Sequence, residues 1–147
     1  MKRADFYILA AADVDSRQQF LAKLCQRILS AGHNIYIYCE NEFNAHKLSE
    51  LLWNFQPQSF LANAVCSEPT TAPITLGWPD NHNPQHREVI VNLSESIPEM
   101  AADFSRIAEI VIQQPEVLTG SRERFREYRQ RGFEIQHNDM RKPRQAH

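Results

Sequence analysis

The sequence predicts one α/β domain in which helices cover both faces of a mostly parallel sheet. Short apolar segments alternate with longer segments whose apolar residues recur at helical spacing, the pattern of strands joined by helices. Few residues separate these segments, so right-handed crossovers should join successive strands. The 147 residues of the chain are enough for one domain with a real core. We expect residues 1–137 to form this domain and residues 138–147 to form a basic, polar C-terminal tail.

The first three elements are expected to form a strand, a helix and a second strand. Residues 5–10 read Asp-Phe-Tyr-Ile-Leu-Ala and predict a buried strand. A helix should follow, because Ser16 and Gln19 have the spacing of a capping box and Gly32 can close its C-terminus. The apolar face of this helix comprises Phe20, Leu21, Leu24, Ile28 and Ala31. Residues 34–39 predict the second strand, parallel to the first.

The second helix is expected over residues 42–55 and carries a large aromatic side chain off its apolar face. The apolar face comprises Ala45, Leu48, Leu51, Leu52 and Phe55. Trp53 lies about 100° or more from most of that face, on the side that carries Ser49 and Glu50. Two interpretations stay open for this tryptophan. The segment that follows can cover it, or it can be a hot spot for a binding partner.

The middle of the chain is irregular and then returns to strands. Residues 56–75 contain Pro57, Pro69 and Pro73 and are expected to form a long ordered loop or strand extension. Residues 74–77 predict a short strand. Residues 88–93, Glu-Val-Ile-Val-Asn-Leu, have the apolar composition of a central strand.

Two further helices are expected in the last third of the chain. The first spans residues 96–111, because Ser96 can serve as its N-cap and a proline follows in the first turn. Its inward face comprises Met100, Phe104, Ile107, Ala108 and Val111. The second runs from about residue 119 to residue 131 and ends at Gly132. Residues 133–135 are expected to add a final short strand.

The last helix concentrates arginine. Five of residues 121–133 are arginines, and at 100° per residue Arg122, Phe125 and Arg129 fall within a stripe about 60° wide, with Arg126 just outside it. A guanidinium can bind a carboxylate or a phosphate with two parallel hydrogen bonds, and a neighbouring ring can hold the apolar part of the same ligand. The alternative is an exposed helix whose charges pair locally and whose aromatic side chains are buried.

The charge of the chain is unevenly distributed. Residues 121–147 carry eight Lys or Arg against four Asp or Glu, whereas residues 1–120 carry eight against fourteen. The C-terminal part is therefore a basic patch on an acidic body. Such a distribution indicates a local anionic partner more than general coating of nucleic acid.

No motif in the sequence indicates a cofactor, a metal or catalysis. The chain has four glycines and lacks both GxGxxG and GxxxxGK[ST], so no loop is suited to cradle a pyrophosphate. It also lacks GxSxG and HExxH. Asp13 and Asp15 could bind Mg²⁺, but the start of a helix already explains them. We therefore expect no cofactor and no enzymatic activity.

The cysteines and histidines do not form a recognisable metal site. Cys25, Cys39 and Cys66 have no CxxC spacing, and their odd number argues against a disulfide framework. They are expected to be buried thiols. His82 and His86 are four residues apart but belong to a segment that reads as a loop, so we expect no metal there.

Seven short motifs together resemble one protein family. They are Phe6-Tyr7-x-Leu9, Cys39-Glu40-x-Glu42, Leu48-x-x-x-Leu52-Trp53, Ser59-Phe60, Ile74-x-x-x-Trp78-Pro79, Val91-Asn92-Leu93, and Arg122-Glu123-Arg124-Phe125-x-x-Tyr128-Arg129-x-x-Gly132-Phe133. In this order and spacing they are similar to the chi subunit of the bacterial DNA polymerase III clamp-loader complex. The resemblance covers nearly the whole chain.

The resemblance implies a Rossmann-like topology and a non-catalytic adaptor. Members of this family link the clamp loader, through the psi subunit, to the single-stranded-DNA-binding protein, so contact with DNA is indirect. The peptide that they bind is the acidic C-terminal tail of that protein, which ends in an apolar residue and a free carboxylate. The basic stripe of the last helix suits such a ligand.

Matching the motifs residue by residue implies a set of tail-binding positions. The tail pocket would comprise Arg122, Phe125, Arg126, Trp53 and Phe60, with Tyr128 and Arg129 as supports. The chain departs from the family pattern at two places. Ala62-Asn63 replaces a Pro-His pair, and Phe125 stands where the family often has tyrosine, which removes a hydroxyl.

Two other function classes stay open at this point. A nucleotide-using α/β enzyme would place its site in a crevice of the sheet. A direct binder of single-stranded nucleic acid would use the basic C-terminal region, with Trp53, Phe125 and Tyr128 as stacking platforms. The sequence has no apolar run near the roughly 20 residues that span a bilayer and no secretory signal. We therefore expect a cytoplasmic protein with no membrane contact.

Overall fold

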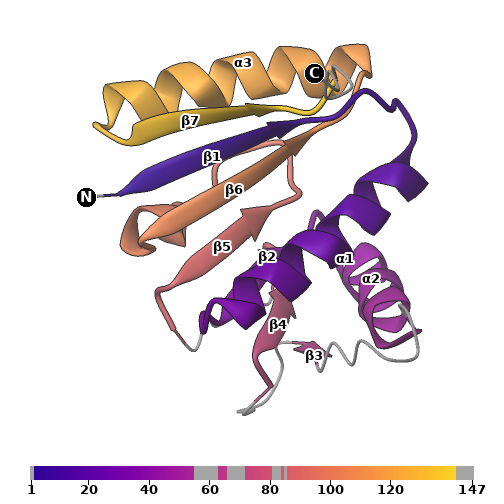
Figure 1. Cartoon of the computed structure of the whole chain (residues 1–147). Coiled ribbons are helices and arrows are strands. Elements are labelled where there is room, and N and C mark those ends of the chain that lie inside the picture. Colours follow the sequence, from indigo (N-terminus) through magenta and orange to yellow (C-terminus); the bar gives the residue numbers. More distant parts are fainter. Residues whose placement is uncertain (1, 55–62, 66–71, 81–83, 85, 142–147) are drawn as a thin grey trace, which may run out of the picture.

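The chain folds as an α/β domain built on a parallel sheet (Figure 1). The computed structural model describes residues 2–54, 63–65, 72–80, 84 and 86–141. In chain order the elements are β1 Arg3–Ile8, α1 Val14–Ser30, β2 Ile35–Tyr38, α2 Glu42–Asn54, β3 Asn63–Val65, β4 Ile74–Gly77, β5 Val89–Asn92, the 3₁₀ helix η1 Glu99–Asp103, β6 Arg106–Val111, α3 Pro115–Gln130 and β7 Glu134–Asp139. The strand order is β3-β4-β2-β5-β6-β1-β7, and every pairing is parallel. The expected fold class is confirmed.

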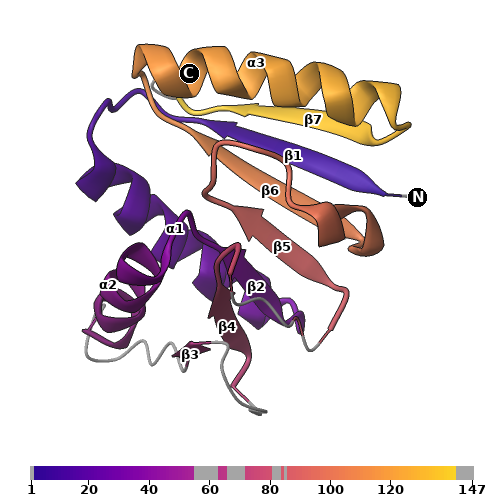
Figure 2. The same ribbon diagram turned by 180° about the vertical axis from the view of Figure 1, so that it is seen from behind.

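The strand order determines which face of the sheet each helix covers. A right-handed crossover places its helix on one face when the chain moves in one direction along the sheet, and on the other face when it moves back. The crossovers through α1 and α2 both move toward β3, whereas those through η1 and α3 move toward β7. As a result, α1 and α2 lie together on one side of the sheet and α3 lies on the other (Figures 1 and 2).

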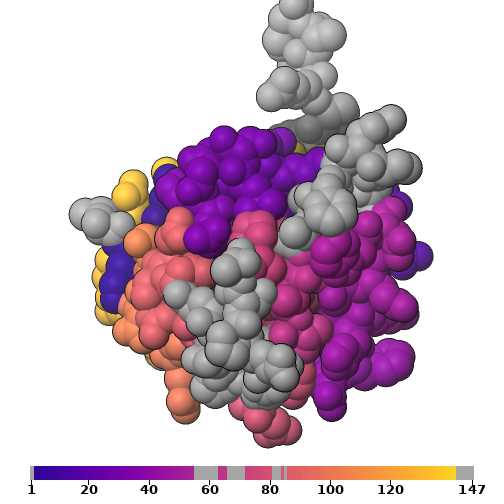
Figure 3. Space-filling view, turned by 90° about the horizontal axis from the view of Figure 1, so that it is seen from below, coloured from indigo at the N-terminus to yellow at the C-terminus, as the bar shows by residue number. Residues whose placement is uncertain are grey.

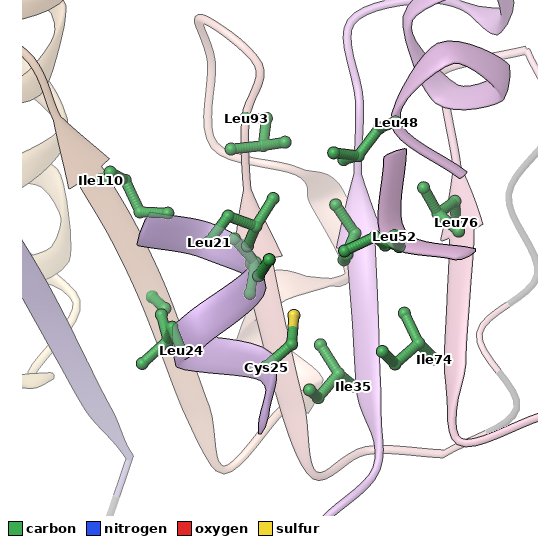
Figure 4. Packing of buried hydrophobic residues seen from close by; sticks show 14 of the residues in the cluster. Leu21, Leu24, Cys25, Ile35, Leu48, Leu52, Ile74, Leu76, Leu93 and Ile110 are labelled. Atoms are coloured by element: carbon green, nitrogen blue, oxygen red, sulfur yellow. The ribbon is translucent and has the colours of Figure 1, made fainter. Parts of the chain in front are cut away.

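The face under α1 and α2 holds the larger core cluster. Leucines of both helices pack on β-branched and leucine side chains of the central strands (Figure 4). The labelled members are Leu21, Leu24, Cys25, Ile35, Leu48, Leu52, Ile74, Leu76, Leu93 and Ile110. In the space-filling view from below, α1 and α2 lie side by side at the surface (Figure 3). Burying these side chains is worth about 1.5–3 kcal/mol each before the cost of ordering the chain.

A second core cluster fills the face under α3 and η1. It comprises Ala4, Phe6, Tyr36, Tyr38, Ile90, Ala101, Phe104, Ile107, Val111, Tyr128 and Phe133. Tyr36 and Tyr38 belong to this cluster, whereas Ile35 and Ile37 belong to the first. Successive side chains of a strand point to opposite faces, so β1, β2, β5 and β6 each contribute to both cores.

The helix α1 is capped at both ends, but its N-cap residue is Asp13 and not Ser16. Asp13 is the N-cap, and its carboxylate accepts hydrogen bonds of 2.9 Å from both the backbone N–H and the hydroxyl of Ser16. These bonds lower the pKa of Asp13. Gly32 and Gly132 follow α1 and α3 with φ of 88° and 86°, a conformation that favours glycine after a helix.

The prediction of a long helix over residues 96–111 is wrong. Only Glu99–Asp103 is helical, as the short η1, and Arg106–Val111 forms β6 between β5 and β1. The segment Ile-Ala-Glu-Ile-Val is rich in β-branched residues and is buried on both faces. A fully buried parallel strand is a continuous apolar run, which sequence periodicity does not separate from a buried helix.

The last helix and strand are both longer than expected. The helix α3 begins at Pro115, which occupies the first turn where proline is well tolerated. The strand β7 extends to Asp139 because the whole segment pairs with β1, from Arg3 opposite Glu134 to Ile8 opposite Asp139. The predicted loop over residues 56–75 lies mostly outside the described residues, although Asn63–Val65 forms the edge strand β3.

Candidate functional site

The helix α3 turns two sets of side chains in different directions. Ser121, Arg124 and Tyr128 are buried against the sheet, whereas Arg122, Arg126 and Arg129 are exposed. Phe125 is half-buried and lies between the two sets. This division follows the 3.6-residue period of the helix.

A groove runs between α3 and the end of the sheet formed by β1 and β7. Its volume is about 470 Å³. The lining residues are Phe6, Ile8, Val111, Leu118, Ser121, Arg122, Phe125, Arg126, Arg129, His137 and Arg141. Its apolar atoms come mainly from β1, β6 and α3, and its charged groups are all cationic. No carboxylate is among the described residues that line it.

Aromatic rings form part of the groove wall. The Phe125 ring centroid lies 5.9 Å from that of Phe6, at an interplanar angle of 69°. The imidazole of His137 lies 5.1 Å from the Phe125 ring and 6.1 Å from the Phe6 ring. These are ordinary distances for favourable edge and tilted contacts. The three rings therefore offer an apolar surface beside the guanidinium groups.

A buried polar network fixes the helix on the sheet. The carboxylate of Glu109 in β6 accepts hydrogen bonds from Arg124 Nε at 3.1 Å, from the Tyr128 hydroxyl at 2.7 Å and from Asn92 Nδ2 at 2.9 Å. Arg124 Nη1 also donates to the carbonyl of Glu95 at 2.6 Å. The bonds to Glu109 tie α3 and β5 to β6, and the bond to Glu95 ties α3 to the segment after β5. The network therefore sets the position of the arginines on the opposite side of the helix.

The helix leaves room for the buried guanidinium at one residue. A Cβ atom at Gly120 would lie 2.9 Å from Arg124 Nη1, closer than ordinary contact.

Burial raises the pKa of Glu109, while Arg124, Tyr128 and Asn92 oppose that rise. Burial also raises the pKa of Tyr128, and the Glu109 carboxylate adds to the effect. The tyrosine is therefore a hydrogen-bond donor at neutral pH.

The structure brings four of the seven expected tail-binding residues to the groove. Arg122, Phe125, Arg126 and Arg129 line it. Tyr128 is fully buried beneath it, with its hydroxyl on Glu109, and so contacts Phe6 rather than the open space. One local ion pair of the kind considered for an exposed helix is present, between Glu127 and Arg131 at 3.0 Å.

The structure separates Trp53 from these residues. It lies near the end of α2 and is 45% exposed. Because α2 covers the opposite face of the sheet from α3 (Figure 1), Trp53 does not line the groove. The expectation that it shares a pocket with the arginine stripe is corrected accordingly. Phe60 lies outside the described residues.

Several groove residues were not identified from the sequence. Phe6 and Ile8 were assigned only to a buried strand, and Val111 to a helix. His137 was missed because the last strand was expected to end at residue 135. The sequence does contain a signal for His137, the alternation of side chains along a strand. His137 is two residues after Ile135, so both side chains point to the face covered by α3.

A second hollow lies at the carboxyl ends of the strands. Its volume is about 850 Å³, and the start of α1, the start of α3 and the end of β5 line it. Here β1 and β6 are neighbours, yet their following helices lie on opposite faces, the position where α/β proteins commonly bind ligands. Its charged lining has both signs, with Arg17, Lys47 and Arg124 against Glu40, Glu95, Glu109, Glu116 and Glu123.

The described residues give this second hollow no metal-binding cluster. No group of three or more His, Cys, Asp or Glu side chains among them is arranged to hold a metal ion. Cys25 and Cys39 are free buried thiols, as expected, and burial raises the pKa of each to about 12. Cys66 lies outside the described residues. Among the described helices, none has the length and apolarity needed to cross a bilayer.

Fold and groove together define a class of protein. It is a Rossmann-like α/β domain in which a cation-rimmed, apolar groove lies between the last helix and the last strand. The family model described as "DNA polymerase III chi subunit, HolC" matches residues 1–136. The chain belongs to this family, and so it is an accessory subunit of a replicative DNA polymerase.

Three relatives carry the same name, DNA polymerase III subunit chi. The protein from Pseudomonas aeruginosa is 33% identical over 98% of this chain and 99% of its own length. The protein from Haemophilus influenzae is 29% identical over 91% of this chain and 94% of its own length. The protein from Escherichia coli is 26% identical over 92% of this chain and 96% of its own length. The similarity therefore extends over nearly the whole of each protein.

Proposed function

We propose that this chi subunit is a non-catalytic adaptor whose α3 groove binds the acidic C-terminal tail of the single-stranded-DNA-binding protein. The observation that carries the proposal is the lining of the groove, where four arginines surround an apolar wall that includes Phe125. A peptide that ends in an apolar side chain and a free carboxylate has the complementary chemistry. The side chain can occupy the apolar wall while guanidinium groups bind the carboxylate.

The local charge favours the same ligand. Arg122, Arg126 and Arg129 project from α3, and Arg141 follows β7. Arg141 also binds Asp139, with Nη2 at 2.7 Å from Oδ2, so its charge is partly balanced. None of the described residues that line the groove is a carboxylate that could pair with the three helix arginines, so acidic residues of a tail can approach them. Exposed cations of this kind accelerate association with an acidic peptide and orient it.

The adaptor role includes a second partner, the psi subunit, and only indirect contact with DNA. Membership of the chi family supports a place in the polymerase complex in the cytoplasm. The exposed α2 side chains Phe43 and Trp53 lie on the face opposite the groove. A peptide in the groove would therefore leave that face open for another protein.

Fluorescence anisotropy with a labelled synthetic peptide tests the proposed ligand. The peptide carries several aspartates, an apolar C-terminal residue and a free carboxylate. We expect saturable binding that Phe125→Ala and Arg126→Glu weaken at least about tenfold, as hot-spot substitutions do. Arg131→Glu is the matched control, because Arg131 is the C-cap residue of α3 and pairs with Glu127 away from the groove. Equal affinity for all variants would contradict the proposal.

An oligonucleotide titration separates the adaptor from a direct nucleic-acid binder. A single strand of about 20 nucleotides is long enough for a typical stacking and backbone site. We expect no saturable binding by the chain alone at physiological salt. Micromolar or tighter binding that Arg126→Glu abolishes would assign the groove to nucleic acid instead.

A further inference from the structure

The strand β7 is an open edge of the sheet beside the groove. It is the last strand in the order β3-β4-β2-β5-β6-β1-β7, and among the described residues only β1 pairs with it. In both ribbon views it is the outermost strand, and α3 runs alongside it (Figures 1 and 2). Its six residues pair with β1 without a break and include neither proline nor lysine. The strand therefore lacks the proline, lysine and bulge that commonly protect an edge from a further strand.

Alternate residues of β7 turn their backbone groups outward. The N–H of Glu134 donates to the carbonyl of Lys2 at 2.9 Å, so this residue faces β1. Backbone groups of successive strand residues point to opposite sides of the strand. The even-numbered residues of β7 therefore face β1, whereas the N–H and C=O groups of Ile135 and His137 face outward. No described residue hydrogen-bonds to these outward groups, which leaves them available to a further strand.

The groove arginines lie on the side of α3 that is nearest this edge. Arg124 extends from the helix toward the other strands, where it reaches Glu109 of β6 and the carbonyl of Glu95 after β5. The stripe of Arg122, Phe125 and Arg129 is centred roughly 130° around the helix from Arg124, at 100° per residue. His137 of β7 lines the groove together with this stripe. A strand added to β7 would therefore pass beside the guanidinium groups.

The spacing of these arginines suits an extended peptide. Arg122 and Arg129 are seven residues apart, about 10 Å along the helix axis, which is the length of about three residues of a strand. The chain reverses direction at Gly132, so α3 and β7 are antiparallel and Arg122 lies toward the carboxyl end of β7 (Figure 1). A peptide with its terminal carboxylate at Arg122 would therefore run parallel to β7, with the residue about three positions earlier near Arg129.

We propose that the acidic, carboxylate-ended peptide binds as a further strand of the sheet, parallel to β7, with backbone hydrogen bonds to Ile135 and His137. The inference rests on the proposed function of the groove and adds to it the conformation and direction of the bound peptide. Alternate side chains of the peptide would meet the arginines and Phe125, and those between them would face away from α3. The backbone bonds supply affinity, and the side-chain contacts with the groove supply specificity.

Backbone N-methylation of the synthetic peptide, one residue at a time, tests the pairing by fluorescence anisotropy. Each methyl group removes one N–H donor and blocks close approach of another strand at that position. We expect alternate positions to weaken binding about fivefold or more, the worth of one hydrogen bond. The positions between them point their N–H groups away from β7 and are the matched controls, with Kd within about twofold of the unmodified peptide. Uniform effects at all positions would overturn the inference.

Amide hydrogen exchange followed by NMR locates the pairing on the full chain. With saturating peptide, we expect exchange at the N–H groups of Ile135 and His137 to slow at least about tenfold. The N–H groups of Gln136 and Asn138 face β1 in the free protein and are the internal controls. Unchanged exchange at Ile135 and His137 would also overturn the inference.

A nitroxide label at the N-terminus of the peptide tests the direction. In the parallel arrangement it should broaden the NMR signals of Glu134 more than those of Met140, and the reverse would overturn the proposed direction. Any of these contrary results, for a peptide whose binding Arg126→Glu still weakens, would leave the proposed function of the groove intact. Peptide binding that Arg126→Glu does not weaken would overturn both.

Discussion

The Tyr128 hydroxyl donates a hydrogen bond of 2.7 Å to Oε2 of Glu109, a carboxylate that is 1% exposed. Tyr128 belongs to α3 and Glu109 belongs to β6. Arg124 reaches the other oxygen of the same carboxylate from one turn earlier on the helix. This contact therefore joins the helix that carries the groove arginines to the middle of the sheet.

Tyr128→Phe should destabilise the fold without removing a groove residue. The substitution takes one donor from a buried carboxylate, which costs about 1–3 kcal/mol of unfolding free energy. Urea denaturation followed by circular dichroism measures the loss, with an unchanged slope as the sign of an intact native state. A loss below about 0.5 kcal/mol would mean that solvent or another group replaces the hydroxyl.

Glu109→Gln should change how stability depends on pH. Burial raises the folded-state pKa of Glu109 above its ordinary value of 4.5, so the folded protein binds this proton more tightly than the unfolded chain. The resulting stabilisation is fully present below the unfolded pKa and is lost as the pH rises through the folded pKa. As the pH rises above about 4.5, wild type should therefore lose stability relative to Glu109→Gln.

Chemical denaturation at several pH values checks this difference. The slope of the difference is the quantity to compare, because Glu109→Gln also alters hydrogen bonds at every pH. A difference that is constant, or that favours wild type as the pH rises, would show that Arg124, Tyr128 and Asn92 outweigh burial and keep the carboxylate ionised.

Trp53→Ala should leave the affinity for an acidic C-terminal peptide within about twofold of wild type. The tryptophan lies on α2, across the sheet from the groove, whereas a hot-spot ring in the groove would cost at least about tenfold. Phe125→Ala is the positive control. A tenfold loss for Trp53→Ala in a folded protein would place the peptide on both faces and contradict the groove as the complete site.

Peptide affinity should fall as salt is added. Four arginines line the groove, and none of its described lining residues is a carboxylate. Exposed charges such as these are screened over about 8 Å at physiological ionic strength. We expect Kd to rise about fivefold or more between low and high salt. Anisotropy titrations in sodium chloride measure it. A constant Kd would mean that apolar contact with Phe125 and Phe6 is the dominant attraction.

The sequence predicted which side chains of α3 face the groove, because the spacing of residues along a helix is local information. The spacing of Arg122, Phe125 and Arg129 determines a helix stripe wherever the helix lies. The position of Trp53 was not predictable in the same way. Which face of the sheet a helix covers depends on strand order, and the order β2-β5-β6-β1-β7 is a set of long-range pairings. Without the strand order, Trp53 of α2 and the arginines of α3 were expected to line one pocket.

The strand β6 shows the same limit for secondary structure. Residues 106–111 were expected to continue a helix, since Ile107, Ala108 and Val111 have helical spacing. In the folded chain β5 and β1 flank this segment, and side chains on both of its faces are buried. Tertiary pairing therefore overrode a local pattern that fits either state. Burial of Glu109 within that strand was equally hidden, because its partners Arg124 and Tyr128 come from the following helix.

The most direct test of the account is a double-mutant cycle between Arg122 and the peptide's terminal carboxylate. The cycle combines wild type and Arg122→Ala with a peptide acid and its C-terminal amide, and calorimetry at fixed salt gives four affinities. Arg131→Ala is the control, since Arg131 lies outside the groove. If Arg122 binds the carboxylate, the two changes should be non-additive, with a coupling of about 1–3 kcal/mol.

Two other results are informative in different ways. Additive losses for Arg122→Ala with coupling for Arg126→Ala would move the carboxylate one turn along α3 within the same groove. Coupling is expected with one of these two arginines and none with Arg131. Additive losses for both Arg122 and Arg126, or a peptide amide that binds as tightly as the acid, would contradict the claim that the groove holds the tail by its terminal carboxylate.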